Sequence, residues 1–463
     1  MYVDSLISDQ FGSLAAPAER ALRGYWIVLF VVVHPFLGLL MFQYEFVATG
    51  HALATLAIGL WWAIRGRWER VLYTGAYLVG AEVLWRMTNA QVFWEYGKYA
   101  ISLLFVIALI RARRLRVPLL PLFFFVLLLP SVWFTTENIE PGLARGLISF
   151  NMSGPLALFI CSWFFFHTRI TRTQMVTMLL GIIAPVLSIA AIASFNTFSS
   201  SDITFGTVSN VTTSGGFGPN QVSSMLGFGG VAAFFYLLLQ KKVGNMHRGF
   251  FIGLMLLFIF QCALTFSRGG LVLALGAGTV AILFLFRDGR SRTLVVVLAI
   301  LLFIFTEFVM LPFMDDFTGG AFLQRYSETS TTGRVGIALV DIKIWQDHPF
   351  FGVGPGRSSV YREFIYGVRV AAHTEFTRLV AEHGTFGVIA LFLLFYMGWR
   401  NHKRRIDVKS KAIFVSLLTW VFLFMLVNAF RLVAPAFAFG ITFTTIMGDA
   451  WRLEPGTISR ALG

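Results

Sequence analysis

Charge is scarce in this sequence. Asp, Glu, Lys and Arg together make up 13% of its 463 residues, whereas hydrophobic residues make up 57% and Phe alone occurs 50 times. A soluble protein of this length could not bury so much apolar surface, so the composition argues against a soluble enzyme and indicates a polytopic membrane protein. The charges sum to +14. In a membrane protein, an excess of positive charge determines which loops face the cytoplasm. It is therefore no sign of nucleic-acid binding, and we expect no nucleic-acid partner.

Cysteine and the common ligand-binding signatures are nearly absent. The two cysteines, Cys161 and Cys262, each lie inside an apolar run, which argues against a disulfide framework. The sequence has no His-Glu-x-x-His motif, no cysteine pair and no aspartate cluster beyond Asp315-Asp316. Its glycine-rich segments have neither Walker nor Rossmann spacing, and no repeat marks the matched halves of many transporters. We therefore predict no metal site and no cofactor.

Long apolar runs dominate the rest of the chain, and a membrane-spanning helix needs about 20 mostly apolar residues. Fourteen segments are candidates: 24–42, 47–64, 71–88, 92–110, 117–134, 150–168, 175–194, 221–240, 249–266, 269–286, 293–312, 387–399, 412–430 and 433–450. The third contains Glu82 and Arg86, the twelfth is short, and the fourteenth contains Pro435. We expect an all-α polytopic membrane protein with about 12–14 transmembrane helices, forming a single integral membrane domain over residues 1–463. Its first apolar run should act as an uncleaved anchor.

Basic residues occur in six clusters, and two candidate spans separate each cluster from the next. The clusters are Arg65/Arg67/Arg70, Arg111/Arg113/Arg114/Arg116, Arg169/Arg172, Lys241/Lys242/Arg248, Arg287/Arg290/Arg292 and Arg400/Lys403/Arg404/Arg405/Lys409/Lys411. All six therefore fall on one side, which the positive-inside rule identifies as the cytoplasm, together with both termini. The opposite side receives residues 135–146, 195–220, 265–270 and the large loop 313–386, which we expect to contain short helices. Polar, glycine-rich and titratable residues are thus concentrated on the outer side.

Two short motifs on the outer side are candidates for ligand binding. In GGFGPNQ (215–221), Asn220 follows a proline that can begin a helix, so it caps that helix or offers its amide to a ligand. In TFSRGG (265–270), Arg268 lies close to the hydrocarbon, where an arginine is costly unless it is paired or solvated. Its planar guanidinium suits a diphosphate, although a snorkelling arginine at the interface is an alternative.

The segment 328–361 contains a Thr332-Gly333-Arg334 element and then a glycine–proline loop, DHPFFGVGPGR, which ends at Arg357. Such a loop can present backbone N–H groups and arginines to an anion, or it can be a loop with tight turns. Arg334 and Arg357 are the candidate ligands of that anion.

Titratable residues are gathered in AAHTEFTRLVAEHGTFG (371–387). On a helix, Glu375, Arg378 and Glu382 share one face at spacings of three and seven, which is typical of an ion-pair ladder. His373 precedes the ladder in an outer segment rich in arginine and glycine. This position makes a functional role for His373 more plausible than it is for an isolated histidine.

Together these motifs resemble the O-antigen ligase and polymerase superfamily of membrane glycosyltransferases. TFSRGG, TGRVGIALVDIKIWQDHPFFGVGPG and HTEFTRLVAEHGTFG keep the order of the superfamily's motifs over a core region at 210–400, most closely at 332–387. The resemblance implies a glycan donor on undecaprenyl diphosphate, with transfer to a lipid A core or to another lipid-linked glycan. It also implies a bacterial inner-membrane protein with a periplasmic active site and membrane lipids as partners. His373 matches the superfamily's essential loop histidine, and Arg268 and Arg334 match its important arginines.

The sequence departs from the ligase pattern at two points. Thr374 follows the histidine where ligases usually have Asn, Ser or Gln, and residues 202–216 contain no arginine. Both departures favour a polymerase, for O-antigen or exopolysaccharide, over an O-antigen ligase. A lipid-linked glycan transporter or flippase is the alternative of another class, but only Glu82, Arg86, Glu95 and Lys98 are candidates for the midplane charges that it would use.

The predicted chemistry is a metal-independent glycosyl transfer. Arg268, Arg334, Arg357 and Arg378 are the candidates for binding the diphosphate and stabilising its charge as it leaves. His373 is the candidate base for the acceptor hydroxyl, because an ordinary histidine has a pKa of about 6.5. Glu375 is expected to orient His373.

Overall fold

A computed structural model describes residues 17–137, 139–201, 203–206, 208–240, 244–328, 333–367, 370–405 and 407–447. The side chains of residues 17–23, 290 and 447 are not described. Thr332 of the predicted anion-binding element lies outside the described residues. The described chain is almost entirely helical, and its two short strands, β1 (Arg169–Thr171) and β2 (Thr445–Met447), pair in parallel. The all-α polytopic fold expected from the sequence is confirmed.

Helices occupy all fourteen predicted segments. They are α2 (Pro17–Gln43), α3 (Glu45–Ile64), α4 (Trp68–Met87), α5 (Tyr96–Arg111), α6 (Leu119–Leu127), α7 (Val132–Thr136), α8 (Pro141–Phe166), α9 (Arg172–Ser199), α10 (Pro219–Leu239), α11 (Asn245–Leu264), α12 (Arg268–Leu285), α13 (Gly289–Phe305), α18 (Glu375–Lys403), α19 (Val408–Val427) and α20 (Ala434–Ile441). Among the described residues, eleven helices are long and apolar enough to cross a membrane, with α6 and α7 counted as one and α13 and the following α14 (Leu311–Thr318) counted as one. The other three segments correspond to α4, α5 and α20. The last has only eight residues, so it is shorter than the predicted span 433–450.

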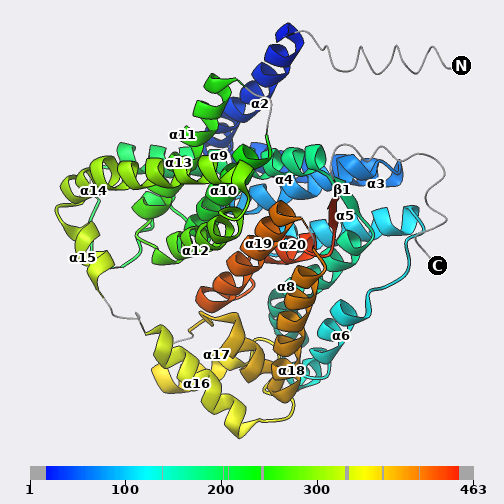
Figure 1. The fold of residues 1–463 in the computed structure, drawn as a ribbon. Helices are drawn as coiled ribbons and strands as arrows, with labels where there is room; N and C mark the ends of the chain where they lie inside the picture. The colour runs from blue at the N-terminus through cyan, green and yellow to red at the C-terminus, as the bar shows by residue number, and fades with distance from the viewer. Residues whose placement is uncertain are drawn as a thin grey trace, which may run out of the picture.

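Short helices fill the predicted loop 313–386. They are α15 (Ala321–Ser327), α16 (Arg334–Asp347) and α17 (Ser358–Tyr366), whereas α14 continues the apolar helix α13 as far as residue 318. Figure 1 shows α16 and α17 at the end of the bundle opposite the N-terminal end of α2, with α18 leading back from them into the bundle. The polar motifs of the chain therefore meet at one end of a helical bundle whose central helices, α9 and α10, are almost wholly buried.

The helix α18 begins at residue 375, twelve residues before the predicted span 387–399. It is interrupted at Gly384, whose φ of 58° and ψ of −139° break the helical hydrogen-bond ladder. The glycine–proline loop compensates for the break, because the N–H groups of Val353 and Gly354 donate to the carbonyls of Ala381 and Glu382 at 3.1 and 3.0 Å. These two N–H groups therefore stabilise α18 and are not available to an anion.

Candidate active site

His373 lies in the short segment between α17 and α18, just before Thr374, whose hydroxyl caps α18. Its side chain is half-buried, and its ring makes no hydrogen bond to any described residue. Burial lowers the pKa of His373 to about 4, and the positive charges of Arg334, Arg431 and Arg362 act in the same direction. The ring is therefore neutral at neutral pH, with a nitrogen lone pair free to accept a proton.

Arginines on three different elements lie near one another at the site: the charge of Arg334 acts on His373, and the charges of Arg268 and Arg325 act on Arg334. Arg334 is the first residue of α16, and burial together with the charges of Arg268 and Arg325 lowers its pKa. Arg268 is the first residue of α12, and its guanidinium donates to the carbonyl of Glu328, just after α15. Arg325 in turn donates from Nε to the carbonyl of Phe266 at 3.2 Å. Because these like charges repel one another, the site is electrostatically suited to an anion that several guanidiniums can share.

Arg431 belongs to the same group, although the sequence motifs did not identify it. Its Nη2 donates to the carbonyl of Ala372 at 3.0 Å, directly before His373, and its buried Nε has no hydrogen-bond partner among the described atoms. Arg431 also lines a pocket of about 90 Å³ together with Asn220, Gln221 and Asn428. The signal in the sequence was available, because Arg431 lies on the predicted outer side of a chain that keeps most arginines on the other side.

Asn220 connects two of the predicted motifs. Its Oδ1 accepts a hydrogen bond from the hydroxyl of Ser267 at 2.8 Å, so the start of α10 lies beside the residue that precedes Arg268. The glycines of TFSRGG serve this contact, because a Cβ on Gly270 would overlap the carbonyl of Ser223 on α10. Asn220 therefore lies at the wall of the small pocket, and the glycines allow two helices to approach each other.

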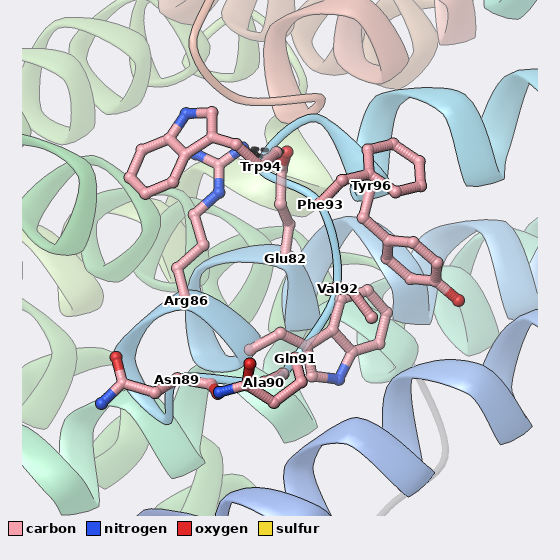
Figure 2. Close-up of a pocket in the computed structure, with 11 residues that line it drawn as sticks. Glu82, Arg86, Asn89, Ala90, Gln91, Val92, Phe93, Trp94 and Tyr96 are labelled. Atoms are coloured by element: carbon pink, nitrogen blue, oxygen red, sulfur yellow. Dashed lines mark hydrogen bonds and ion pairs between the residues drawn. The ribbon is translucent and has the colours of Figure 1, made fainter.

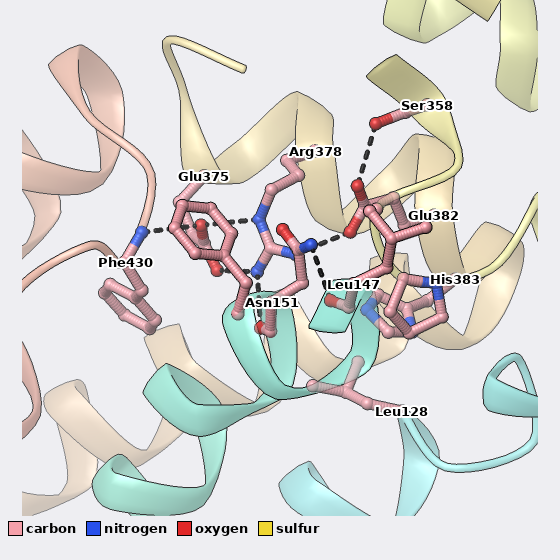
Figure 3. A network of polar contacts seen from close by, with 12 residues as sticks. Leu128, Leu147, Asn151, Ser358, Glu375, Arg378, Glu382, His383 and Phe430 are labelled. Carbon is pink, nitrogen blue, oxygen red and sulfur yellow. Dashed lines mark hydrogen bonds and ion pairs between the residues drawn. The ribbon is translucent and has the colours of Figure 1, made fainter. Parts of the chain in front are cut away.

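The predicted ladder on α18 is present and is deeply buried (Figure 3). Arg378 donates from Nε to Glu375 at 2.9 Å and from Nη1 to Glu382 at 2.6 Å, and the side chain of Arg378 is 4% exposed. Glu375 also accepts a hydrogen bond from the backbone N–H of Phe430 at 2.9 Å. No hydrogen bond joins Glu375 to His373 in the described chain, so Glu375 and Arg378 are engaged with each other and with the fold.

Hydrogen bonds connect the ion pairs of α18 to the loop helices α16 and α17. Glu382 accepts a hydrogen bond from Ser358 at 2.8 Å, and Ser358 accepts one from Arg362 at 2.6 Å. Arg362 pairs with Asp341 on α16 at 3.0 Å, and the second oxygen of Asp341 accepts from Thr377 at 2.8 Å. This buried network ties α16 and α17 to α18, and thereby fixes both Arg334 and His373 with respect to the membrane helices.

Charged side chains also hold the break between α19 and α20. Glu82 accepts from the N–H of Val433 at 2.7 Å, and Arg86 donates to the carbonyl of Arg431 at 3.0 Å. The buried Lys98 lies 3.4 Å from the carbonyl of Phe430. Non-helical backbone within a membrane protein must have its polar groups satisfied by protein, and these side chains do so here. Three of the four residues considered for a transporter, Glu82, Arg86 and Lys98, are therefore engaged with the backbone around Arg431.

Arg357, which was predicted to bind an anion, and the second histidine of α18, His383, are engaged elsewhere in the fold. Arg357 donates to the carbonyls of Phe134 and Glu137 at 3.3 and 2.9 Å, and so attaches the glycine–proline loop to the end of α7. Its charge is not among those that act on His373. His383, ten residues after His373, is fully buried and its Nδ1 lies 2.5 Å from the hydroxyl of Ser131. In the described part of the chain, no group of three or more His, Cys, Asp or Glu side chains is arranged to hold a metal ion.

Part of the chain is similar to a known protein family. Residues 252–392 match the family model described as O-antigen ligase, and no curated protein matches the sequence. The matched segment begins in α11, contains Arg268, Arg334 and His373, and ends within α18. Enzymes of this family are ligases and polymerases that process lipid-linked glycans in membranes. The resemblance seen in the motifs is thus confirmed over residues 252–392, where this multi-pass membrane protein is similar to the O-antigen ligase family.

Proposed function

We propose that the protein transfers a glycan from an undecaprenyl-diphosphate donor to an acceptor hydroxyl at the periplasmic face of the bacterial inner membrane. The observation that carries the proposal is a neutral, half-buried histidine without hydrogen-bond partners in the described chain, surrounded by arginines. The acceptor we favour is another lipid-linked glycan, as in an O-antigen or exopolysaccharide polymerase, because Thr374 and the arginine-free segment 202–216 depart from the ligase pattern. Transfer to a lipid A core, as in an O-antigen ligase, is the second candidate.

In the proposed reaction, Arg268, Arg334 and Arg431 bind the diphosphate of the donor. His373 accepts the proton of the acceptor hydroxyl while the oxygen forms a bond to the anomeric carbon, and the bond from that carbon to the diphosphate breaks. The lipid diphosphate leaves with the bonding electron pair, and the guanidiniums stabilise its charge. The donor also makes His373 a stronger base, because its negative charges offset the arginines that contribute to the low pKa of the free site.

The other predicted site residues have supporting roles in this scheme. Glu375 and Arg378 position His373 and Arg431, since Glu375 bonds both to Arg378 and to the backbone N–H of Phe430. Arg357 holds the loop against α7, and Asn220 contributes an amide to the pocket that Arg431 lines. Because arginines supply the positive charge, we propose a metal-independent reaction that continues in EDTA.

Arg268→Ala should lose most transfer activity while the protein remains folded and membrane-inserted. Arg268 contributes a planar fork of donors that a diphosphate accepts, and one such electrostatic contact is worth roughly 10²–10³-fold in rate. Arg268→Lys keeps the charge but loses the fork, so it should also lose much of the activity. The measurement is transfer of a radiolabelled lipid-linked glycan by each variant, normalised to purified protein. Near wild-type rates for Arg268→Ala would remove this residue from the donor site.

The proposed orientation predicts which positions are accessible from outside the cell. Phe364 on α17 is 86% exposed and Met246 at the start of α11 is 89% exposed, so a cysteine at either position can react. Both native cysteines are buried and provide a low background. An impermeant maleimide should label Phe364→Cys in intact spheroplasts and Met246→Cys only after permeabilisation. The reverse pattern would contradict the periplasmic placement of His373.

A further inference from the structure

A second pocket lies beside the candidate active site, between the end of α4 and the start of α5 (Figure 2). Its volume is about 240 Å³. This is below the range of about 300–1,000 Å³ that holds drug-sized ligands, so it suits a single ring of a larger molecule. Its wall consists mainly of Glu82, Arg86 and the segment 89–94, with Trp85 and Tyr96 behind them.

Both aromatic rings and hydrogen-bonding groups line this pocket. Trp94 and Phe93 are 44% and 56% exposed, so they present ring surface to a ligand. Tyr96 and Trp85 are buried, and each is fixed by a hydrogen bond, from Tyr96 to the carbonyl of Ala52 at 2.8 Å and from Trp85 to a histidine ring on α3 at 2.9 Å. A pyranose has apolar C–H faces that lie on aromatic rings and a rim of hydroxyls that need polar partners. This wall offers both kinds of surface.

The polar groups are arranged for a neutral ligand. Arg86 pairs with Glu82 at 2.8 Å, so the one guanidinium in the pocket is already neutralised. Arg86 also lies 4.7 Å from the ring centroid of Trp94 and donates to the Trp94 carbonyl at 3.0 Å, which holds the tryptophan in place. Asn89, in the left-handed region at φ 49°, is exposed, and its side chain makes no hydrogen bond to any described residue. A diphosphate would find too little positive charge here, and a lipid chain would meet polar groups.

The pocket adjoins the proposed donor site. Arg86 donates to the side chain of Gln221 at 2.6 Å, and Gln221 lines the small pocket that also contains Asn220 and Arg431. Arg431 in turn bonds the residue before His373. The Arg86–Gln221 pair therefore separates the proposed diphosphate-binding arginines from the aromatic pocket.

We propose that this aromatic pocket binds a sugar residue of the glycan chain, apart from the bond that is broken. The proposal rests on the proposed glycosyl transfer, but it concerns glycan recognition and not the diphosphate. The pocket acts as a subsite that positions the chain, and Trp94 and Asn89 are the residues that select the sugar.

Binding of an isolated glycan tests the proposal. The probe is the oligosaccharide released by mild acid from the host's own lipid-linked glycan, titrated into purified protein in nanodiscs. Trp94→Ala should weaken binding of this oligosaccharide at least 10-fold, and Asn89→Ala, which removes only an exposed side chain, should weaken it by a smaller factor. Trp133→Ala is the matched control, because Trp133 is 70% exposed on the same predicted side and lies outside the pocket. Wild-type affinity in Trp94→Ala and Asn89→Ala would overturn the proposal and leave Trp94 as an interfacial anchor.

A second probe separates this proposal from the proposed function. Farnesyl diphosphate carries the diphosphate and an isoprenoid tail but no sugar. Trp94→Ala should bind it as the wild type does, which also shows that the variant is folded, whereas Arg268→Ala should lose that binding and keep the oligosaccharide. If farnesyl diphosphate binds equally to wild type and Arg268→Ala, the donor site is wrongly assigned. The oligosaccharide result still decides the pocket. Loss of both probes in Trp94→Ala would contradict a sugar-specific role.

Discussion

His373→Ala should lower glycan transfer by about 10²–10⁴-fold, the usual effect of removing a general base. Protein level and farnesyl diphosphate binding should stay at wild-type values, because the ring is half-buried and bonds to no described residue. The measurement is single-turnover transfer with a saturating lipid-linked donor. Since the base acts only in the chemical step, the loss should appear in the rate constant and not in the donor concentration that gives half-saturation.

His383→Ala is the matched control for this substitution. His383 is fully buried against Ser131, so its removal should lower thermal stability and protein level. Transfer per folded molecule should stay far closer to wild type than it does in His373→Ala. Normal transfer by His373→Ala, or equal losses per folded molecule in both variants, would identify the helix start as structural and not catalytic.

The pH dependence of kcat/KM gives an independent readout of the same residue, since it reports ionisations of the free enzyme. The pKa of His373 is lowered to about 4, so the base is active above that value and is lost only as the pH falls through it. Activity should therefore persist at pH 5.5, where an ordinary histidine would be about nine-tenths protonated. A fall centred near pH 6.5 would show that burial and the neighbouring arginines do not lower the pKa of His373 in the free enzyme.

Arg378→Ala should prevent accumulation of folded protein. The substitution leaves the carboxylates of Glu375 and Glu382 buried without their shared partner. Breaking a buried ion pair in this way costs about 3–5 kcal/mol, a large part of the stability of a typical domain. The readout is the amount of detergent-extracted monodisperse protein and its thermal midpoint.

Lys343→Ala is the control for Arg378→Ala. It breaks a pair with Asp347 of similar length, 3.0 Å, on the exposed face of α16, so it should leave both the yield and the midpoint unchanged. A wild-type midpoint for Arg378→Ala would show that the ladder does not hold α18, and that Arg378 is free for the substrate-binding role expected from the sequence.

Most membrane helices could be predicted because a run of about 20 consecutive apolar residues rarely occurs outside a membrane-spanning helix. The membrane span of α18 could be predicted only from residue 387, because residues 375–386 contain four charged or histidine side chains, although their spacing indicates a helix. These polar groups are also bonded to distant parts of the chain, as Glu382 is to Ser358 and Glu375 is to the backbone N–H of Phe430. A window of sequence contains no information on such distant pairing. The last predicted span is shorter in the structure for a related reason, since α20 ends at Ile441 and the chain continues into β2, which pairs with the distant strand β1.

The residues of the candidate site also divide into those that sequence motifs identify and those that depend on contacts between distant parts of the chain. His373, Arg268 and Arg334 could be chosen because they lie in ordered motifs on the predicted outer side. Arg431 also lies on the predicted outer side, but its contact with the residue before His373 depends on the irregular backbone between α19 and α20, which only the three-dimensional structure reveals. Arg357 and the glycine–proline loop had two interpretations in the sequence, and the contacts with α7 and α18 favour the structural one.

The most direct test of the account is a reaction in proteoliposomes that contain the purified protein, a lipid-linked glycan repeat and EDTA, with and without a lipid A core acceptor. We predict new glycosidic products in EDTA, as a ladder of lengthened glycans without the core acceptor, and loss of these products in His373→Ala. A single shifted product that requires the core would favour the ligase over the polymerase. Movement of intact donor to the other leaflet without any new glycosidic bond would contradict the account and identify a transporter.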